Sequence, residues 1–451
     1  MINKIHDYRC SLVSGVQAEK IIISLQLFGY NKHLKANLQT KPIIELYCQI
    51  QHDLTFAFPN ISHQGIVIVK YSHQQSLFPW HENCHFELLI DGDQYFPAML
   101  ESIRQAQHYI LFENYLTESS QITSQFIKAF TDARARGVIV RLLLDDFGAK
   151  GLVERDRECL LEAGIETIFY NPFSYKRFIR SLRRNHRKIL IIDGHYAYAG
   201  GAGLTDEFSH EYNPHQSWHD VMVKVHGLIV HDWIAVFRHS WQQCNPGEWG
   251  LPVIPAPVPI HASAGHVAIS QGPRLQEINR DFIKHIRSAE QQVWLMTPYF
   301  MAARKIRNAL KQAARRGVDV RIILPGYISD HPWVSRAARG FYARLLKNKV
   351  RIFEFNHRFP HAKIEFCDQW VSIGSSNLDR WNQHWNMDAN QEIDASPFAD
   401  KVRELFENDF TECTEITYEQ WHQRPRLHRL REWFWGRFVM LLEVFTRNYQ
   451  K

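Results

Sequence analysis

The sequence lacks any apolar run long enough to cross a bilayer. A membrane-spanning helix needs about 18 or more consecutive apolar residues, and no such stretch occurs among the 451 residues. Residues 1–20 are mixed polar and lack the apolar core of a signal peptide. We therefore expect a protein without a transmembrane helix.

Cysteine pairs are also missing. The seven cysteines are odd in number and scattered, and none forms a CxxC pair. This pattern is typical of reduced thiols in a cytoplasmic protein, and it argues against a disulfide framework or a zinc site.

A strong charge of either sign is absent as well. Lys plus Arg is 53 and Asp plus Glu is 47, which leaves a net charge of +6. This mild excess permits an anionic partner without requiring one. The chain is 45% hydrophobic and 22% charged, with 13 Trp, so the composition favours a globular protein of two to four domains.

The chain contains one pattern twice. ARARGVIVRLLL at 133–144 matches AARRGVDVRIIL at 313–324, and LLEAGIETIFYN at 160–171 matches LLKNKVRIFEFN at 345–356. Strands are predicted at 109–115, 138–144 and 165–170, and a helix face is formed by Ile122, Phe126, Ala129, Phe130 and Ala133. The nearly constant offset indicates two copies of one α/β unit.

These copies divide the chain into five segments. We assign an N-terminal extension of unknown role to 1–80, a first repeat to 81–250, a Pro-rich linker to 251–273, a second repeat to 274–415 and a basic, aromatic tail to 416–451. The linker carries prolines that remove donors from a strand ladder.

Each copy ends in the motif H-x-K-x(4)-D followed by a glycine turn. The first is NHRKILIIDG at 185–194, and the second is PHAKIEFCDQ at 360–369. Residues i and i+2 of a strand face the same side, so each His lies beside its Lys. Two such strands would place two imidazoles and two ammonium groups around one space, which suits an anionic phosphoryl group. One His can attack phosphorus, and the other can protonate the leaving alcohol.

This duplicated motif resembles that of the phospholipase D superfamily, over about 86–410. Within it, the segments at 90–107, 185–194, 203–208 (GLTDEF) and 374–381 (GSSNLDRW) are most similar to bacterial cardiolipin synthases without transmembrane helices. The resemblance implies two α/β/α repeats, each a mixed sheet flanked by helices, with one active site at their interface. It also implies phosphatidyl transfer through a phospho-histidine, without metal or cofactor. The motif residues concerned are His186, Lys188, Asp193, His361, Lys363 and Asp368.

The resemblance also assigns roles. Either His serves as nucleophile or as general acid/base, and we favour His186 as nucleophile. Both Lys would bind phosphate oxygens, both motif Asp would fix a turn, and further phosphate contacts would come from Asn377 and Ser375. Asp220 in WHDV and Asp388 in NMDA match positions that orient the His. Gly203 departs from the pattern, because the family usually has Asn there.

Several alternatives stay open at this point. The substrates implied are phosphatidylglycerol and, as another donor, phosphatidylethanolamine, with no nucleic acid. A hydrolytic phospholipase D, another phosphatidyltransferase, a nuclease or an inactive scaffold would share the motif. Glu113 and Asn114 either line the site or satisfy buried groups. The irregular run of His between 195 and 231 favours an exposed loop over a metal site.

The tail at 424–451, RPRLHRLREWFWGRFVMLLEVFTRNYQK, mixes aromatic and basic residues. This composition is typical of a helix lying in an anionic membrane interface, although a helix packed on the core is the alternative. We therefore expect a peripheral enzyme on the cytoplasmic face of the inner membrane.

Overall fold

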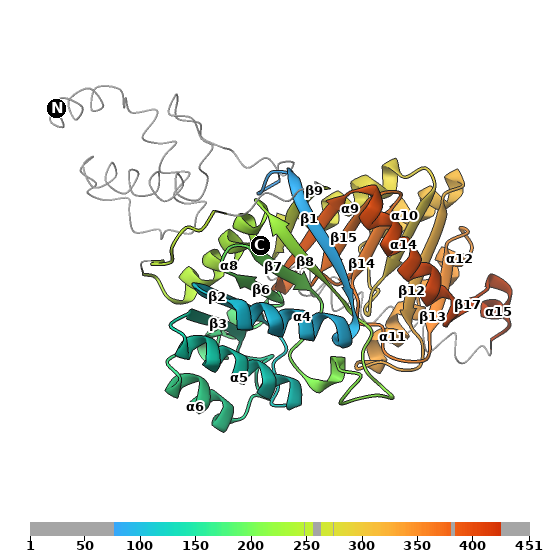
Figure 1. The fold of residues 1–451 in the computed structure, drawn as a ribbon. Helices are drawn as coiled ribbons and strands as arrows, with labels where there is room; N and C mark the ends of the chain where they lie inside the picture. Colours follow the sequence, from blue (N-terminus) through green and yellow to red (C-terminus); the bar gives the residue numbers. More distant parts are fainter. Residues whose placement is uncertain (1–75, 248, 256–262, 274, 380–383, 425–451) are drawn as a thin grey trace, which may run out of the picture. The chain divides into compact units, whose positions relative to one another are not determined.

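The computed structural model describes residues 76–247, 249–255, 263–273, 275–379 and 384–424 (Figure 1). They belong to one compact unit, Tyr71–Lys451. The predicted extension over 1–80 falls almost entirely outside the described residues, and so does the tail from 425 onwards. The last described helix is α15 (Tyr418–Gln423).

The first repeat alternates strands and helices along the chain. Its elements are β1 (His81–Ile90), α4 (Asp91–Gln105), β2 (Tyr109–Asn114), α5 (Gln121–Ala135), β3 (Ile139–Asp145), α6 (Glu154–Glu162), β4 (Glu166–Tyr170), η3 (Tyr175–Arg177), α7 (Phe178–Ser181), β5 (Arg184–Asn185), β6 (Ile189–Ile192), β7 (Tyr196–Gly200), η4 (Asp206–Phe208), β8 (Val221–Gly227) and α8 (Val230–Cys244).

The second repeat follows the same order. Its elements are β9 (Ser263–Gln271), β10 (Leu275–Gln276), α9 (Glu277–Ser288), β11 (Gln292–Met296), α10 (Arg304–Arg316), β12 (Asp319–Pro325), α11 (Pro332–Arg339), α12 (Tyr342–Leu346), β13 (Arg351–Phe355), β14 (Ile364–Cys367), β15 (Trp370–Gly374), β16 (Asn386–Asp394), α14 (Ser396–Thr411) and β17 (Cys413–Ile416).

The predicted strands and helices of both copies are confirmed. β2, β3 and β4 lie at the strands predicted for the first copy, and α5 buries the predicted apolar face. Gly317 ends α10 with φ +100°, and Gly137 has φ +91° at the corresponding place. Only glycine adopts this left-handed backbone without strain, which explains why both copies keep it.

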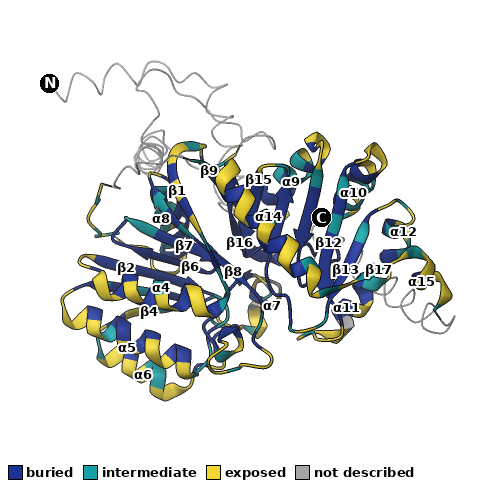
Figure 2. Cartoon of the chain, turned by 45° about the vertical axis from the view of Figure 1, so that its right-hand side comes forward, coloured by how far each residue is buried: buried dark blue, intermediate teal, exposed yellow. Residues whose placement is uncertain are grey.

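Each repeat is a mixed sheet covered by helices. β2, β3 and β4 are parallel, and β6, β7 and β8 continue the sheet in antiparallel order. In the second repeat β11, β12 and β13 are parallel, and β14, β15 and β16 are antiparallel. Figure 2 shows the strands buried and the outward faces of α4, α5 and α14 exposed. The predicted fold class is confirmed.

The sheets of the two repeats are continuous, which the linker prediction did not anticipate. β9 lies inside the predicted linker 251–273, pairs with β1 and pairs along its length with β16. The prolines end at Pro259, four residues before β9, so they remove no donor from its ladder. The division of the chain into five segments stays a prediction, with this boundary moved to about residue 262.

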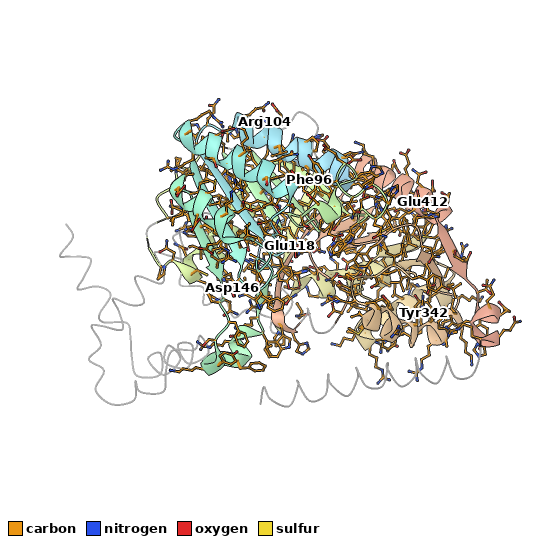
Figure 3. All side chains as sticks on the ribbon, turned by 90° about the horizontal axis from the view of Figure 1, so that it is seen from below. Phe96, Arg104, Glu118, Asp146, Tyr342 and Glu412 are labelled. Carbon is orange, nitrogen blue, oxygen red and sulfur yellow. The ribbon has the colours of Figure 1, made fainter. Side chains whose placement is uncertain are left out.

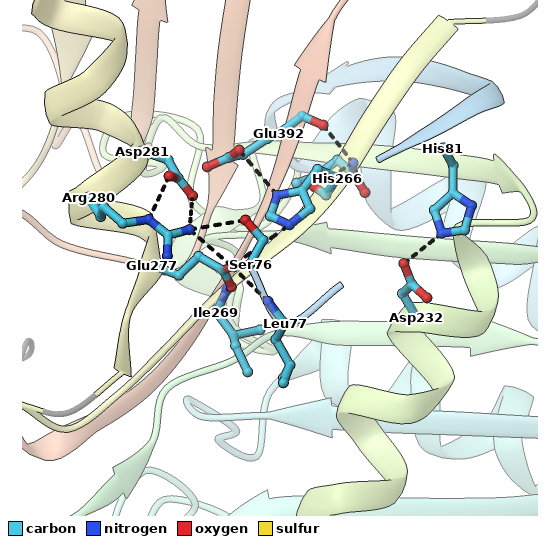
Figure 4. Close-up of polar contacts among 11 residues, drawn as sticks. Ser76, Leu77, His81, Asp232, His266, Ile269, Glu277, Arg280, Asp281 and Glu392 are labelled. Carbon is cyan, nitrogen blue, oxygen red and sulfur yellow. Dashed lines mark hydrogen bonds and ion pairs between the residues drawn. The ribbon is translucent and has the colours of Figure 1, made fainter. Parts of the chain in front are cut away.

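A buried ion-pair network lies beside β9 and α9 (Figure 4). His266 Nδ1 lies 3.2 Å from a Glu392 oxygen, and the His266 ring stacks on Trp80. Both Asp281 oxygens accept hydrogen bonds from one edge of the Arg280 guanidinium, and both Glu277 oxygens accept backbone N–H groups. One atom of each of His266, Asp281 and Glu392 could bind a metal ion, and these three atoms lie within 4.8 Å of one another. Both Asp281 oxygens, His266 Nδ1 and one Glu392 oxygen have partners inside the network, whereas His266 Nε2 and Glu392 Oε1 have no hydrogen-bond partner among the described residues.

None of the described helices is long and apolar enough to cross a membrane.

Candidate active site

The two HxK segments lie at the same edge of their sheets. Lys188 directly precedes β6, whose first residue Ile189 pairs with Glu113 near the carboxyl end of β2. Lys363 precedes β14, whose first residue pairs with Met296 at the carboxyl end of β11. Both His and both Lys side chains are buried. Parallel strands present their carboxyl ends together, so each repeat brings one His and one Lys to this edge.

The second repeat holds the His of the first. His186 donates its backbone N–H to the Met387 carbonyl, at 3.0 Å. Its Nδ1 lies 3.0 Å from both Asp388 Oδ1 and the Ser375 carbonyl oxygen. Two acceptors at Nδ1 favour the tautomer with the proton there, which leaves a lone pair on Nε2.

The first repeat holds the His of the second in the same way. His361 donates its backbone N–H to the His219 carbonyl, at 2.7 Å, and its Nδ1 lies 2.6 Å from Asp220 Oδ2. Burial would raise the pKa of Asp220, but Lys363 and His361 hold it below its usual value. The carboxylates that orient the two His are therefore exchanged between the repeats, so neither repeat contains a complete pair.

The four cationic and imidazole groups affect one another's protonation. Burial, followed by Lys188, lowers the pKa of His186 to about 4 against the raising effect of Asp388. Burial and Lys363 lower the pKa of His361 to about 3, although Asp220 raises it. Burial lowers the pKa of Lys363 to about 8, and burial with Lys363 lowers that of Lys188. Both imidazoles are therefore neutral near pH 7 until a negative charge joins them.

The motif aspartates do not join this centre. Asp193 follows β6, at the opposite end of that strand from Lys188, and adopts φ +52°. Its carboxylate accepts the backbone N–H groups of residues 107, 108 and 109, at 2.7–2.8 Å. Asp368 has φ +54° and accepts those of residues 290, 291 and 292. Both carboxylates hold a turn against the start of a parallel strand.

The other predicted phosphate ligands differ from each other. The Asn377 side chain is buried, and neither its amide nitrogen nor its oxygen has a partner among the described residues. Ser375 instead donates its hydroxyl to Asp388 Oδ1 at 2.9 Å and accepts the Ala389 N–H. Ser375 thus supports the carboxylate that orients His186, while the Asn377 amide is available for a ligand.

Gly203 has no room for the Asn of the family pattern. A Cβ at this position would lie 2.9 Å from the Leu116 Cβ and 3.0 Å from its carbonyl oxygen. The first repeat therefore lacks the side-chain donor that Asn377 offers in the second, and the site is asymmetric.

Glu113 satisfies buried groups rather than lining the site. It accepts the Asn185 amide at 2.6 Å and lies 3.8 Å from the Arg187 guanidinium. Arg187 is itself buried and also donates to Ser240. Asn114 is buried with an unpartnered Oδ1 at the carboxyl end of β2.

Sequence reasoning underestimated His219. This buried side chain lies between Asp91 (2.8 Å) and Asp409 (3.2 Å). Burial lowers the pKa of His219, but Asp409 and Asp91 together raise it to about 10. Arg358 pairs with the other Asp91 oxygen at 2.7 Å. A charged His219 therefore holds the backbone segment that presents His361, and only its position beside Asp220 hinted at this.

Aromatic rings complete the surroundings. The Tyr115 ring lies 4.8 Å from the His186 ring, and the Lys188 ammonium lies 5.1 Å from the centre of Tyr115. Trp218 and Phe208 lie 5.1 and 5.3 Å from the His361 ring. These rings limit the access of water to both imidazoles.

Two His–Lys pairs, with orienting carboxylates exchanged between duplicated α/β units, define a phospholipase D-type enzyme. The family model described as "Cardiolipin synthase, PLD-like domain" matches residues 99–241 and 282–410. The chain belongs to this family, whose members are phosphatidyltransferases of the phospholipase D superfamily.

Curated relatives agree with this assignment. The chain is 29% identical over 383 residues to a cardiolipin synthase of Clostridium perfringens, covering 83% of this chain and 80% of that protein. It is 29% identical over 423 residues to cardiolipin synthase 2 of Bacillus anthracis, covering 89% and 80%.

Solved structures share the fold. The crystal structure of phosphatidylserine synthase from Haemophilus influenzae superimposes with a TM-score of 0.60 at 12% identity, covering 83% of this chain and 96% of that one. Polyphosphate kinase from Porphyromonas gingivalis gives a TM-score of 0.52 at 14% identity, covering 74% and 49%.

Proposed function

We propose that this protein synthesises cardiolipin by transferring a phosphatidyl group from one phosphatidylglycerol to the glycerol hydroxyl of another. The observation that carries the proposal is the exchanged pair of contacts, His186 with Asp388 and His361 with Asp220. The transfer step needs a nucleophile and an acid at the same time, and this arrangement supplies two oriented imidazoles for these two roles.

In the first half-reaction, Nε2 of His186 attacks phosphorus. A P–N bond forms, the P–O bond to the leaving glycerol breaks, and His361 gives its proton to the leaving oxygen. The two acceptors at Nδ1 of His186 favour a lone pair on its Nε2, whereas Nε2 of His361 lies 3.1 Å from Lys363 Nζ, and this difference supports the assignment. In the second half-reaction, His361 takes the proton of the acceptor hydroxyl, the P–O bond forms and the P–N bond breaks.

His361 must be protonated at the start, although it is neutral in the free protein. Lys363 Nζ lies 2.9 and 3.1 Å from the two His361 nitrogens and so opposes protonation. A bound phosphodiester would attract this ammonium group and add a negative charge of its own. The 2.6 Å contact with Asp220 would then favour the imidazolium. Substrate binding would thereby create the acid.

Lys188, Lys363 and Asn377 would hold the non-bridging oxygens. Their charge and hydrogen bonds stabilise the negative charge that builds up at phosphorus, and a buried site strengthens this effect. The enzyme would act as a peripheral protein at the bilayer surface that contains its substrate, and phosphatidylethanolamine is a second donor to be tested.

Lipid analysis in a bacterial host that lacks its own cardiolipin synthases tests the proposal. We expect the wild-type chain to restore cardiolipin, and the His186→Ala and His361→Ala variants to restore none. Purified enzyme with radiolabelled phosphatidylglycerol vesicles should yield labelled cardiolipin and free glycerol. Phosphatidic acid as the sole product would instead identify a hydrolase, and DNA cleavage without lipid turnover would identify a nuclease.

A further inference from the structure

Exposed large apolar side chains gather in three loops. Twelve described residues of this kind are at least one-third exposed, and six of them lie in the three segments that connect β3, β4 and β12 to the next strand or helix, or in the short helical turns of these segments. We call these six the aromatic rim: Phe147 after β3, Phe173, Tyr175 and Phe178 after β4, and Tyr327 with Ile328 after β12.

The aromatic rim borders the candidate active site from both repeats. The loops follow the carboxyl ends of parallel strands, which is the edge that carries the two HxK segments. Arg184, two residues before His186, pairs with Asp145 and lies over the Phe147 ring at 5.9 Å. In the second repeat, Asp330 of the loop after β12 lies close enough to raise the pKa of Lys363.

The longest of these loops is strongly basic. Residues 171–183 (NPFSYKRFIRSLR) contain four Lys or Arg and no Asp or Glu. Of these cations, Lys176, Arg180 and Arg183 are exposed. Figure 3 shows this segment extending outwards beyond the loop that carries the labelled Asp146.

The exposed rings of this loop are packed against one another. Phe173 contacts Tyr175 and Phe178 edge to face, at 4.9 and 6.3 Å between ring centres. Tyr175 is nevertheless 89% exposed, and Tyr327 in the other repeat is 84% exposed. The nearby carboxylates have partners, because Asp146 accepts the Phe173 N–H and Asp330 accepts the Tyr299 hydroxyl.

We propose that the aromatic rim docks onto the surface of an anionic bilayer, so that a lipid phosphate reaches the His–Lys centre without leaving the membrane. Aromatic rings prefer the interfacial region of a bilayer, and Lys and Arg beside them are attracted to anionic headgroups. A protein partner would need apolar groups that match rings on three separate loops and acidic groups that match the basic loop 171–183, whereas a bilayer supplies an apolar interface and anionic charge everywhere along its surface. This inference rests on the proposed function and adds the surface that delivers its substrate.

The test uses the full-length protein and two rim variants. Lys176→Gln/Arg180→Gln removes two exposed cations, and Tyr175→Ala/Tyr327→Ala removes one exposed ring from each repeat. Lys128→Gln/Leu161→Ala is the matched control, because both side chains are exposed on α5 and α6, outside the three loops. Binding is measured by sedimentation with vesicles of phosphatidylglycerol and phosphatidylcholine, and with vesicles of phosphatidylcholine alone.

Activity is measured in parallel on phosphatidylglycerol vesicles and on a short-chain phosphatidylglycerol below its micellar concentration. We expect the charge variant to bind anionic vesicles roughly 30-fold more weakly, from about fivefold for each cation. Both rim variants should lose vesicle activity and keep activity on the dispersed substrate, while the control resembles the wild type.

An unchanged ratio of vesicle to dispersed-substrate activity in both rim variants would overturn the proposal. A concentration-dependent dimer that either rim variant abolishes would overturn it too, because the rim would then be a protein interface. Failure of the proposed function would give a different result. The wild type would then form no cardiolipin from either substrate, while vesicle binding would still distinguish the rim variants from the control.

Discussion

Replacing Asp220 with Asn should slow departure of the leaving alcohol. Asp220 stabilises the protonated form of His361, the proposed acid, which belongs to the other repeat. The substitution keeps a side chain of the same size near His361 Nδ1 but removes the negative charge at 2.6 Å. Opposite charges about 4 Å apart attract by roughly 4 kcal/mol at an effective dielectric constant near 20. If rearrangement offsets about half of this, the imidazolium loses about 2 kcal/mol, which is roughly a 30-fold slower protonation step.

The assay compares two leaving groups. Phosphatidylglycerol releases an alkoxide that must be protonated, whereas phosphatidyl-p-nitrophenol releases an anion that is stable without a proton. Asp220→Asn should lower the rate with phosphatidylglycerol roughly 30-fold and leave the first burst of p-nitrophenol near the wild-type rate. Asp388→Asn removes the charge that orients His186. It should slow both the burst of p-nitrophenol and the release of glycerol from phosphatidylglycerol.

The comparison also tests the assignment of the two His. An unaffected burst in Asp388→Asn together with a slow burst in Asp220→Asn would make His361 the nucleophile. Equal losses with both substrates in both variants would refute the separate roles altogether. Far-UV circular dichroism and thermal unfolding of both variants serve as the control for folding.

Three further changes have expected outcomes. Asn377→Ala should lower kcat/KM by roughly 10²-fold, the usual effect of losing one donor to a developing charge, with little change in unfolding; Asn390→Ala, whose amide bonds Ser376 and Ser372, should chiefly reduce stability in urea. His219→Gln should destabilise the fold by about 3 kcal/mol, because the buried Asp409 carboxylate loses its ionic partner and Asp91 keeps only Arg358; because the folded pKa is raised to about 10, the wild-type advantage is complete below about pH 6.5 and disappears as the pH rises towards 10. Gly203→Asn should lower the melting temperature through its contact with Leu116, whereas Gly247→Asn, with no atom within 4 Å of its Cβ, should not.

The local parts of the site could be predicted from the sequence, because they depend on short spacings. The i, i+2 spacing of H-x-K predicts that His and Lys lie side by side, and the repeat shows that this happens twice. The structure places both segments directly before β6 and β14, whereas the spacing predicted them within the strands. The exchange of Asp220 and Asp388 could not be predicted, because it depends on contacts 141 and 202 residues apart in the chain. The same holds for His219, whose partners come from 128 and 190 residues away.

The boundary of the linker and the aromatic rim were missed for other reasons. β9 begins directly after a Pro-rich stretch, so composition masked a strand whose ladder lies wholly beyond the prolines. The rim residues have no periodicity, because they lie in loops after β3, β4 and β12, and only the fold brings these loops to one edge.

Exchange of the orienting carboxylates also explains why two diverged copies in one chain are useful. A symmetric pair of HxK units would give both His the same surroundings, whereas nucleophile and acid need opposite protonation states. The copies differ at several places beside the reacting groups, and three of them change the size or charge of a side chain strongly. The first repeat has Gly203 where the second has Asn377, Arg187 where the second has Ala362, and His219 where the second has Met387. Because each repeat orients the other's His, a change in one copy alters the surroundings of the imidazole in the other copy. Fusion of the two copies in one chain ensures that the two different environments always occur together.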